Sequence, residues 1–172
     1  ILGENFIKKD NVALILGDNF FYGQSLTKTL LKCVKLKSGS KVILHRVINP
    51  EKFGVAKVKN KKIISIKEKP KNFLSDLAIT GLYFFDNKVV NLSKNLKPSK
   101  RNELEITDLN NIFLKEGLLK VEILPKGSVW FDTGTYSTYS SACEFIRVVQ
   151  ERQKILIGSI EETAFNLNLI NQ

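Results

Sequence analysis

Two apolar runs with a helix-patterned segment between them constrain the fold of this chain most. Residues 11–16 (NVALIL) form a short apolar run that ends at Gly17, which is typical of a strand covered on both faces. Residues 24–37 then carry leucines at helical spacing before a stop at Ser38-Gly39, and residues 41–47 (KVILHRV) form a second strand-like run. A strand, a helix and a strand joined by short connections predict a crossover in an α/β sheet.

The rest of the chain continues the mixture of strands and helices. Residues 53–70 predict two strands that turn at Asn60-Lys61, and simple alternation in the second places Ile64, Ile66 and Glu68 on one face. Further strands are predicted over residues 76–86, 118–125 and 128–132, and helices over residues 87–97, 107–117, 135–156 and a last segment capped by Ser159 and Glu162.

The length of 172 residues allows one sizeable core, so we expect a single domain over residues 1–172. The sequence has no methionine and begins at Ile1, which favours a piece of a longer protein. No apolar run approaches the length of a membrane span, and the first residues do not follow the order of a signal peptide. We therefore expect a cytoplasmic protein with no membrane partner.

The net charge of +10 raises the question of a nucleic-acid partner. Only four of the 27 basic residues are arginine, whereas nucleic-acid grooves favour its planar fork, so a lysine-rich bias predicts no nucleic-acid role. Cys33 and Cys143 lie far apart in helical patterns and are expected to be buried, and His45 is expected in a strand. A Cys/His metal cluster cannot be built from these residues.

Two aspartates follow strand-like runs and are candidate metal ligands. Asp18 comes after NVALILG, and Asp132 ends the aromatic run SVWFD. Ligands of open α/β sheets bind at the carboxyl ends of strands, and Mg²⁺ prefers carboxylate oxygens. A cap on the following helix or turn is an equally good interpretation of Asp18, and spacing does not show whether the two aspartates meet.

Glu68-Lys69-Pro70 is a second candidate, since an acid on an apolar strand face needs a partner such as a sugar hydroxyl, and Lys69 is suited to a phosphate. An ordinary solvated strand end in a lysine-rich region is the alternative. Gly54 and Gly81 interrupt predicted strands, where they indicate either close approach of a ligand or an ordinary bulge.

Six blocks, taken in order, resemble the sugar-nucleotide pyrophosphorylases, most closely the glucose-1-phosphate thymidylyltransferases. They are LGDNFFYG, NPEKFGV, SIKEKP, ITGLYFFD, ELEITDLN and WFDTGT. The resemblance implies a Rossmann-like nucleotidyltransferase fold of the α/β class with a mixed sheet. It also implies dTTP and glucose 1-phosphate as substrates, dTDP-glucose and pyrophosphate as products for deoxysugar pathways such as rhamnose synthesis, and a homo-oligomer for the full-length protein.

By position in these blocks, the resemblance also assigns roles to residues. Asp18 and Asp132 look like Mg²⁺ ligands, and Lys69 looks like the catalytic lysine that holds the sugar phosphate. The resemblance implies substrate contacts for Asn19, Gly54, Glu68, Lys69 and Ile79, to which we add Gly81 and Trp130.

The family's N-terminal strand and its GGxGTR phosphate loop do not occur in this sequence. We therefore expect little turnover from the chain alone and an unpaired sheet edge that promotes self-association. Three alternatives stay open: a sister transferase that uses UTP, ATP or CTP, a non-catalytic basic binding module, and a gene remnant without function.

Overall fold

The computed structural model describes residues 2–99 and 102–171. These divide into two compact units, one ending at Trp130 and the other beginning at Phe131. The first unit is an α/β unit built on one sheet, and the second consists mainly of helices.

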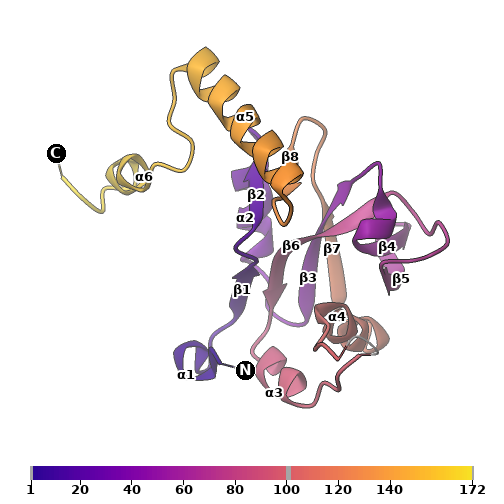
Figure 1. The fold of residues 1–172 in the computed structure, drawn as a ribbon. Coiled ribbons are helices and arrows are strands. Elements are labelled where there is room, and N and C mark those ends of the chain that lie inside the picture. The colour runs from indigo at the N-terminus through magenta and orange to yellow at the C-terminus, as the bar shows by residue number, and fades with distance from the viewer. Residues whose placement is uncertain (1, 100–101, 172) are drawn as a thin grey trace. The chain divides into compact units, whose positions relative to one another are not determined.

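The main sheet of the first unit has the strand order β5-β4-β6-β3-β7, and β1 also pairs with β6 (Figure 1). Its strands are β1 (Val12–Ile15), β3 (Ser40–Arg46), β4 (Gly54–Lys59), β5 (Lys62–Glu68), β6 (Leu77–Phe85) and β7 (Leu119–Ile123). β3 and β7 run parallel, whereas β6 is antiparallel to β1, β3 and β4, so the sheet is mixed as predicted.

The crossover predicted from the opening segments is confirmed. β1 and β3 are both antiparallel to β6 and hence run in the same direction, and α2 (Leu26–Cys33) lies between them in the chain. β3 occupies the whole length of one edge of β6, so β1 shares the opposite edge with β4. All nine residues of β6 are buried, which explains its continuous apolar sequence.

Side chains alternate between two core clusters along the central strands. On β6, Tyr83 and Phe85 belong to the larger cluster, whereas Leu82 and Phe84 belong to the smaller one. The larger cluster includes residues of α3 (Lys88–Lys94) and α4 (Ile106–Lys115), and α4 packs against β5 and β7 (Figure 1). Cys33 of α2 lies in the smaller cluster, so helices cover both faces of the sheet.

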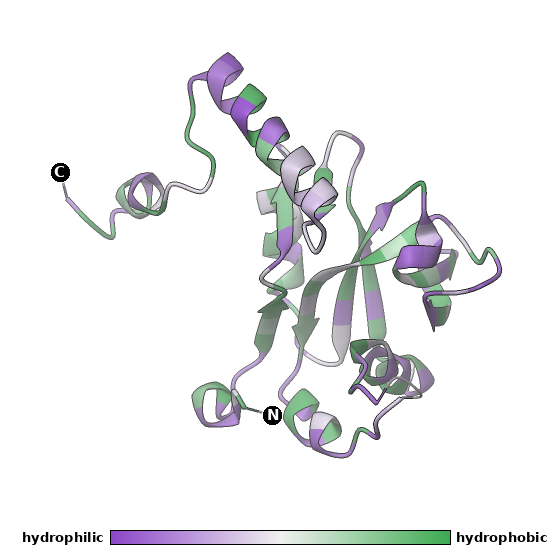
Figure 2. Cartoon of the chain, viewed as in Figure 1, coloured by the Kyte–Doolittle hydropathy of each residue, from purple (hydrophilic) through white to green (hydrophobic). Residues whose placement is uncertain are grey.

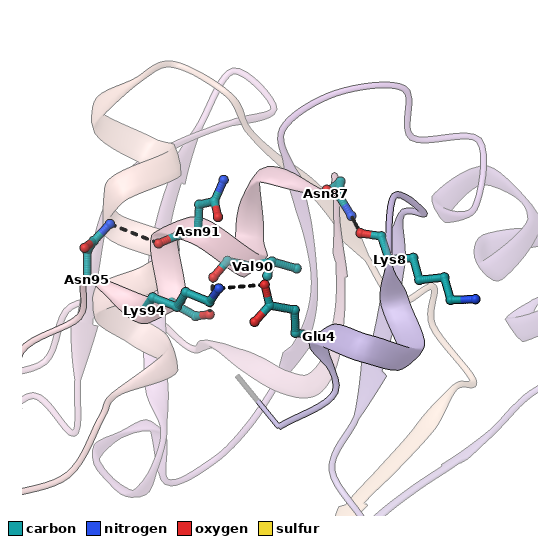
Figure 3. A network of polar contacts seen from close by, with 8 residues as sticks. Glu4, Lys8, Asn87, Val90, Asn91, Lys94 and Asn95 are labelled. Atoms are coloured by element: carbon teal, nitrogen blue, oxygen red, sulfur yellow. Dashed lines mark hydrogen bonds and ion pairs between the residues drawn. The ribbon is translucent and has the colours of Figure 1, made fainter.

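Three elements were not predicted: the short helix α1 (Glu4–Ile7), the strand β2 (Asn19–Tyr22) and the 3-10 helix η1 (Pro50–Lys52). α1 is tied to α3, because Glu4 forms a 2.6 Å ion pair with Lys94 (Figure 3). The amide of Asn87 also donates to the carbonyl oxygen of Lys8 at 2.8 Å and to that of Asp10 at 2.9 Å. These bonds fix the chain just before β1.

The alternation predicted for β5 is wrong at Ile64. The turn at Asn60-Lys61 is confirmed, with φ of 51° and 59°. The register with β4 then shifts so that Lys57 faces Ser65 and Val58 faces Ile63. This bulge leaves Ile64 51% exposed and turns both Ile63 and Ile66 into the core, because one extra residue reverses the alternation.

β1 is apolar along its length (Figure 2), yet the prediction that it is covered on both faces is wrong. Leu14, Ile15 and Leu16 are 39%, 55% and 40% exposed. Within the described residues, β1 pairs with β6 alone, so its other edge and much of its side-chain surface lack packing partners.

The second unit contains α5 (Tyr136–Gln153) and α6 (Ile160–Asn166), close to the predicted helices. Thr135 and Thr138 form a reciprocal capping box at the start of α5, and the Ser159 side chain accepts the Glu162 N–H at the start of α6. The prediction that both cysteines are buried holds for Cys33 and is wrong for Cys143, which lies on an exposed face of α5.

Among the described residues, none of the helices is long and apolar enough to cross a membrane.

Candidate functional site

The turn between β1 and β2 carries the first predicted metal ligand. Leu16 extends the pairing of β1, donating its N–H to the carbonyl oxygen of Gly81 at 2.9 Å, and the Asn19 N–H then closes the turn onto Leu16. Asp18 lies exposed in this turn. It does not cap the next helix, because Ser25 is the N-cap residue of α2. The apolar strand thus ends by presenting a carboxylate, as predicted.

The Asn19 side chain is held by three hydrogen bonds. Its Oδ1 accepts the backbone N–H of Gly81 at 3.0 Å and the indole N–H of Trp130 at 2.6 Å. Its Nδ2 donates to Oδ1 of Asp18 at 2.8 Å. Two N–H donors require the oxygen on their side, so the network fixes which way the amide faces. Asn19 therefore orients the carboxylate of Asp18.

Gly81 is required by this arrangement. A β-carbon at position 81 would lie 2.5 Å from Cγ and Nδ2 of Asn19 and 2.6 Å from its Oδ1. Gly81 lies in the stretch of β6 where the register with β3 shifts, between the pairs Val42–Tyr83 and Leu44–Ile79. The group that approaches the backbone here is the Asn19 amide, and the register shift fits the bulge that was the alternative; the approach of a ligand stays a prediction.

Trp130 ends the first unit and lies half-buried among aromatic rings. Its ring centroid is 5.1 Å from that of Phe53, and His45 meets it edge-on at 6.1 Å. Nε2 of His45 lies 3.2 Å from the carbonyl oxygen of Ser128, which can only accept, so this nitrogen carries the proton. His45 lies in β3, as predicted, and has a structural role here.

Gly54 and Glu68 are direct partners across β4 and β5. Oε2 of Glu68 accepts a 2.5 Å hydrogen bond from the hydroxyl of Thr107, the buried second residue of α4. A β-carbon on Gly54 would lie 3.1 Å from that carboxylate oxygen and 3.2 Å from the hydroxyl. Glu68 is thus a half-buried, held carboxylate rather than a solvated strand end. Burial, and secondarily the charge of Glu68, raise the pKa of the Tyr83 hydroxyl.

Thr107 is a site residue that the sequence reasoning missed. It stands within the block ELEITDLN, one of the six blocks that carry the resemblance. From sequence, a threonine near the start of a helix is interpreted as an ordinary capping or surface residue. Only the packing of α4 against β5 brings its hydroxyl to Glu68.

Lys69 is exposed and has an unusual backbone. Its φ is 40°, in the left-handed region, although it precedes Pro70 and carries a β-carbon. Such conformations are disfavoured and persist where surrounding contacts enforce them. Here the Lys69 N–H donates to the carbonyl oxygen of Phe53 at 3.0 Å, which holds the turn in place.

Two further residues were predicted for the site, Ile79 and Asp132. Ile79 is 7% exposed, and its side chain belongs to the larger core cluster, opposite Leu44 of β3. Asp132 ends β8 (Val129–Asp132), lies in the second unit, is half-buried and accepts the N–H of Gly134 at 3.1 Å.

The structure therefore assembles two clusters within the first unit. The first cluster comprises Asp18, Asn19, Gly81 and Trp130, and the second comprises Gly54, Glu68 and Thr107, with Phe53 and Lys69 beside it. Among the described residues, no group of three or more histidine, cysteine or acidic side chains forms a ready metal centre. Carboxylates such as those of Asp18 and Asp132 are the type of oxygen donor that could hold Mg²⁺, which commonly takes one or two carboxylates and completes its shell with phosphates and water.

Comparison with known proteins places these clusters in context. The sequence profile of the nucleotidyl transferase family matches residues 1–148. A glucose-1-phosphate thymidylyltransferase of Neisseria meningitidis serogroup A is 49% identical over 166 residues, which cover 96% of this chain and 58% of that protein. A glucose-1-phosphate thymidylyltransferase of Mycolicibacterium smegmatis is 41% identical over 172 residues, with 99% and 59% covered.

Solved structures agree with the fold. A Bacillus anthracis crystal structure in complex with sucrose, assigned to glucose-1-phosphate thymidylyltransferase, gives a TM-score of 0.75 at 43% identity and covers 84% of this chain and 57% of that one. A UDP-glucose pyrophosphorylase complexed with UDP-glucose gives a TM-score of 0.73 at 24% identity, with 83% and 58% covered. The fold is the Rossmann-like one of nucleotidyltransferases, and the chain spans a little under three-fifths of the length of these proteins.

Proposed function

Because the chain belongs to the nucleotidyl transferase family, we propose that the protein transfers a thymidylyl group from dTTP to glucose 1-phosphate, giving dTDP-glucose and pyrophosphate. The observation that carries this proposal is the identity of 49% with a glucose-1-phosphate thymidylyltransferase over nearly the whole chain. The two clusters of the first unit support it. They offer the Asp18 carboxylate oriented by Asn19, the Glu68 carboxylate bonded to Thr107, and Lys69 beside it.

The reaction needs two anions to approach one another. An oxygen of the sugar phosphate attacks the α-phosphorus of dTTP, a new P–O bond forms, and the bond to pyrophosphate breaks. The attacking oxygen is already ionised near neutral pH, so no general base is needed. The ammonium of Lys69 is suited to hold the sugar phosphate and to screen its repulsion from the nucleotide.

Asp18 and Asp132 are the residues that would hold Mg²⁺. The ion, when bound, supplies positive charge that neutralises the phosphates of the nucleotide. The Nδ2–H of Asn19 keeps the Asp18 carboxylate in one orientation. Glu68, already accepting from Thr107 with Oε2, is suited to accept a sugar hydroxyl as well, because a carboxylate has about four acceptor positions.

The remaining proposals concern the whole protein. We propose that it is Mg²⁺-dependent and cytoplasmic, supplies deoxysugar pathways such as dTDP-rhamnose synthesis, and acts as a homo-oligomer. The 172-residue chain by itself is proposed to bind the sugar phosphate but to turn over slowly, because no GGxGTR phosphate loop occurs in it.

The test measures binding and turnover separately. Calorimetric titration of the chain with glucose 1-phosphate and with dTDP-glucose, each with Mg²⁺ and with a chelator, is expected to show Mg²⁺-dependent binding of dTDP-glucose. A separate turnover assay with dTTP and glucose 1-phosphate is expected to show little pyrophosphate release. Tighter binding of UDP-glucose, ADP-glucose or CDP-glucose than of dTDP-glucose would favour a sister transferase. Rapid pyrophosphate release would contradict the proposed slow turnover.

A basic binding module makes a different prediction. Single-stranded DNA would then bind with an affinity that falls steeply as salt rises, since phosphate contacts release counterions. We expect no such binding.

A further inference from the structure

We propose that Trp130 is a positioning residue that holds the Asp18-Asn19 turn and the Phe53–Lys69 backbone contact in one fixed geometry. The inference rests on the proposed function, because it concerns how the acid and the lysine of that reaction are kept in place. Trp130 lies in the same unit as both and contacts each side through a different part of its ring system.

The indole N–H of Trp130 fixes the Asp18-Asn19 turn. It donates to Oδ1 of Asn19 at 2.6 Å, and this oxygen also accepts the Gly81 N–H. Both acceptor positions of the amide oxygen are thereby used, and one of its two N–H bonds points at Asp18. The amide cannot rotate without breaking one of these bonds. Its hydrogen bond from Nδ2 therefore fixes the orientation of the Asp18 carboxylate. What Asn19 can still offer a substrate is a single N–H, which selects an acceptor oxygen.

The contact between the Trp130 and Phe53 rings fixes the backbone contact between Phe53 and Lys69. The Trp130 and Phe53 rings are tilted by 56° with centroids 5.1 Å apart, an arrangement in the favourable range for aromatic pairs. The carbonyl oxygen of Phe53 accepts the Lys69 N–H at 3.0 Å. This bond is what supports the left-handed φ of 40° at Lys69. A shift of the Phe53 backbone would therefore break this hydrogen bond and remove the support for the left-handed backbone of Lys69.

Trp130 is itself held from a third direction. His45 meets the indole edge-on and is bonded through Nε2 to the Ser128 carbonyl, two residues before Trp130. Trp130 also packs against the smaller core cluster, which contains Ile43 and Phe84. An aromatic side chain anchored on the core is a rigid spacer between two parts of a site.

The test uses the fact that Trp130 is the sole tryptophan, so one indole N–H signal reports on it in a ¹H–¹⁵N spectrum of the 172-residue chain. Replacing Asn19→Ala removes the acceptor of the indole N–H, together with the bonds to Gly81 and Asp18. We expect the indole signal to shift and the backbone amide of Lys69 to shift with it. In a Trp130→Leu background, Asn19→Ala is expected to leave the Lys69 amide unchanged.

Two further variants separate the two contacts. Trp130→Phe keeps a ring beside Phe53 but removes the indole donor, and it is expected to alter the Asn19 side-chain amide signals and to shift the Lys69 amide no more than Asn19→Ala does. Phe53→Leu keeps the donor and is expected to shift the Lys69 amide while leaving the Asn19 signals in place. These two variants keep the proposal falsifiable where Trp130→Leu fails to fold.

Ligand binding provides the functional readout. Glucose 1-phosphate is expected to bind Trp130→Phe about two- to tenfold more weakly, as for the loss of one hydrogen bond. The proposal is overturned if Asn19→Ala leaves both the indole and the Lys69 signals unmoved, or if Trp130→Phe and Phe53→Leu perturb both sides equally. The spectra without ligand test the positioning role alone, whereas absence of glucose 1-phosphate binding by the unmodified chain would contradict the proposed function instead.

Discussion

The amide of Asn19 lies where a side chain on Gly81 would have to be, with only 2.5 Å between its Cγ and the position of that β-carbon. β6 therefore carries a glycine where the Asn19 side chain of the turn after β1 packs against the strand.

Gly81→Ala is expected to displace the Asn19 amide, because no side chain atom tolerates a carbon at that distance. The indole of Trp130 then loses its acceptor, and its fluorescence is expected to change together with a fall in melting temperature. Gly17→Ala is the matched control, since a β-carbon there meets nothing within 4 Å. Equal behaviour of the two variants would refute the role assigned to Gly81.

Asn19→Asp tests the donor to Asp18. The replacement puts two carboxylates where the structure has an amide N–H and its acceptor 2.8 Å apart, so they repel. We expect a lower melting temperature at low salt and partial recovery at high salt, because the charge on the exposed Asp18 is screened. A loss of stability that is independent of salt would contradict this explanation.

Thr107→Val tests the hydroxyl that holds Glu68. Valine has nearly the same shape but cannot donate, which leaves the half-buried carboxylate without this bond. We expect unfolding in urea to require about 1–2 kcal/mol less free energy, together with weaker binding of glucose 1-phosphate. Thr107→Ser keeps the hydroxyl and is expected to retain binding; a loss of binding as large as in the valine variant would point to packing instead.

The two cysteines are expected to differ in reactivity. Burial raises the pKa of the Cys33 thiol to about 11, whereas Cys143 is exposed. A thiol-reactive dye should therefore label Cys143 quickly and Cys33 only on unfolding. The chain with Cys143→Ser should react slowly and the chain with Cys33→Ser quickly, and the reverse order would contradict the burial of Cys33.

The same thiol predicts a dependence of stability on pH. Its folded pKa of about 11 exceeds the ordinary value of 9.0, so the folded chain holds the proton longer than the unfolded chain. This contribution is fully present below pH 9.0 and is lost as the pH rises towards about 11. Urea unfolding at pH 8 and pH 10.5 should show a smaller decline for Cys33→Ala than for the unmodified chain.

The exposed side of β1 is expected to cause self-association. Among the described residues this strand pairs with β6 alone, and Ile15 is 55% exposed. Light scattering should show larger species as concentration rises, and Ile15→Lys should reduce them. Ile48→Lys is the control, because Ile48 is 96% exposed but lies outside the strands. A monomer at all concentrations would contradict this expectation.

The sequence alone determined those features that depend on neighbours along the chain. The strand, helix and strand of residues 12–46 follow from local periodicity, and the turn at Asn60-Lys61 follows from residues that tolerate positive φ. The ordered blocks also indicated the family that the comparisons then showed. The roles assigned to Asp18 and Asp132 as metal ligands, to Lys69 as the catalytic lysine and to all the proposed substrate contacts stay predictions.

Tertiary structure decided what depends on distant neighbours. The bulge that exposes Ile64 arises from pairing with β4, and the exposed position of Cys143 depends on what packs against α5. The bond from Trp130 to Asn19 joins residues 111 positions apart, and the bond from Thr107 to Glu68 joins residues 39 apart. Periodicity shows which face of an element is apolar, but only packing shows which side chains contact one another. The geometry of the clusters around Asn19 and Glu68 depends on such contacts.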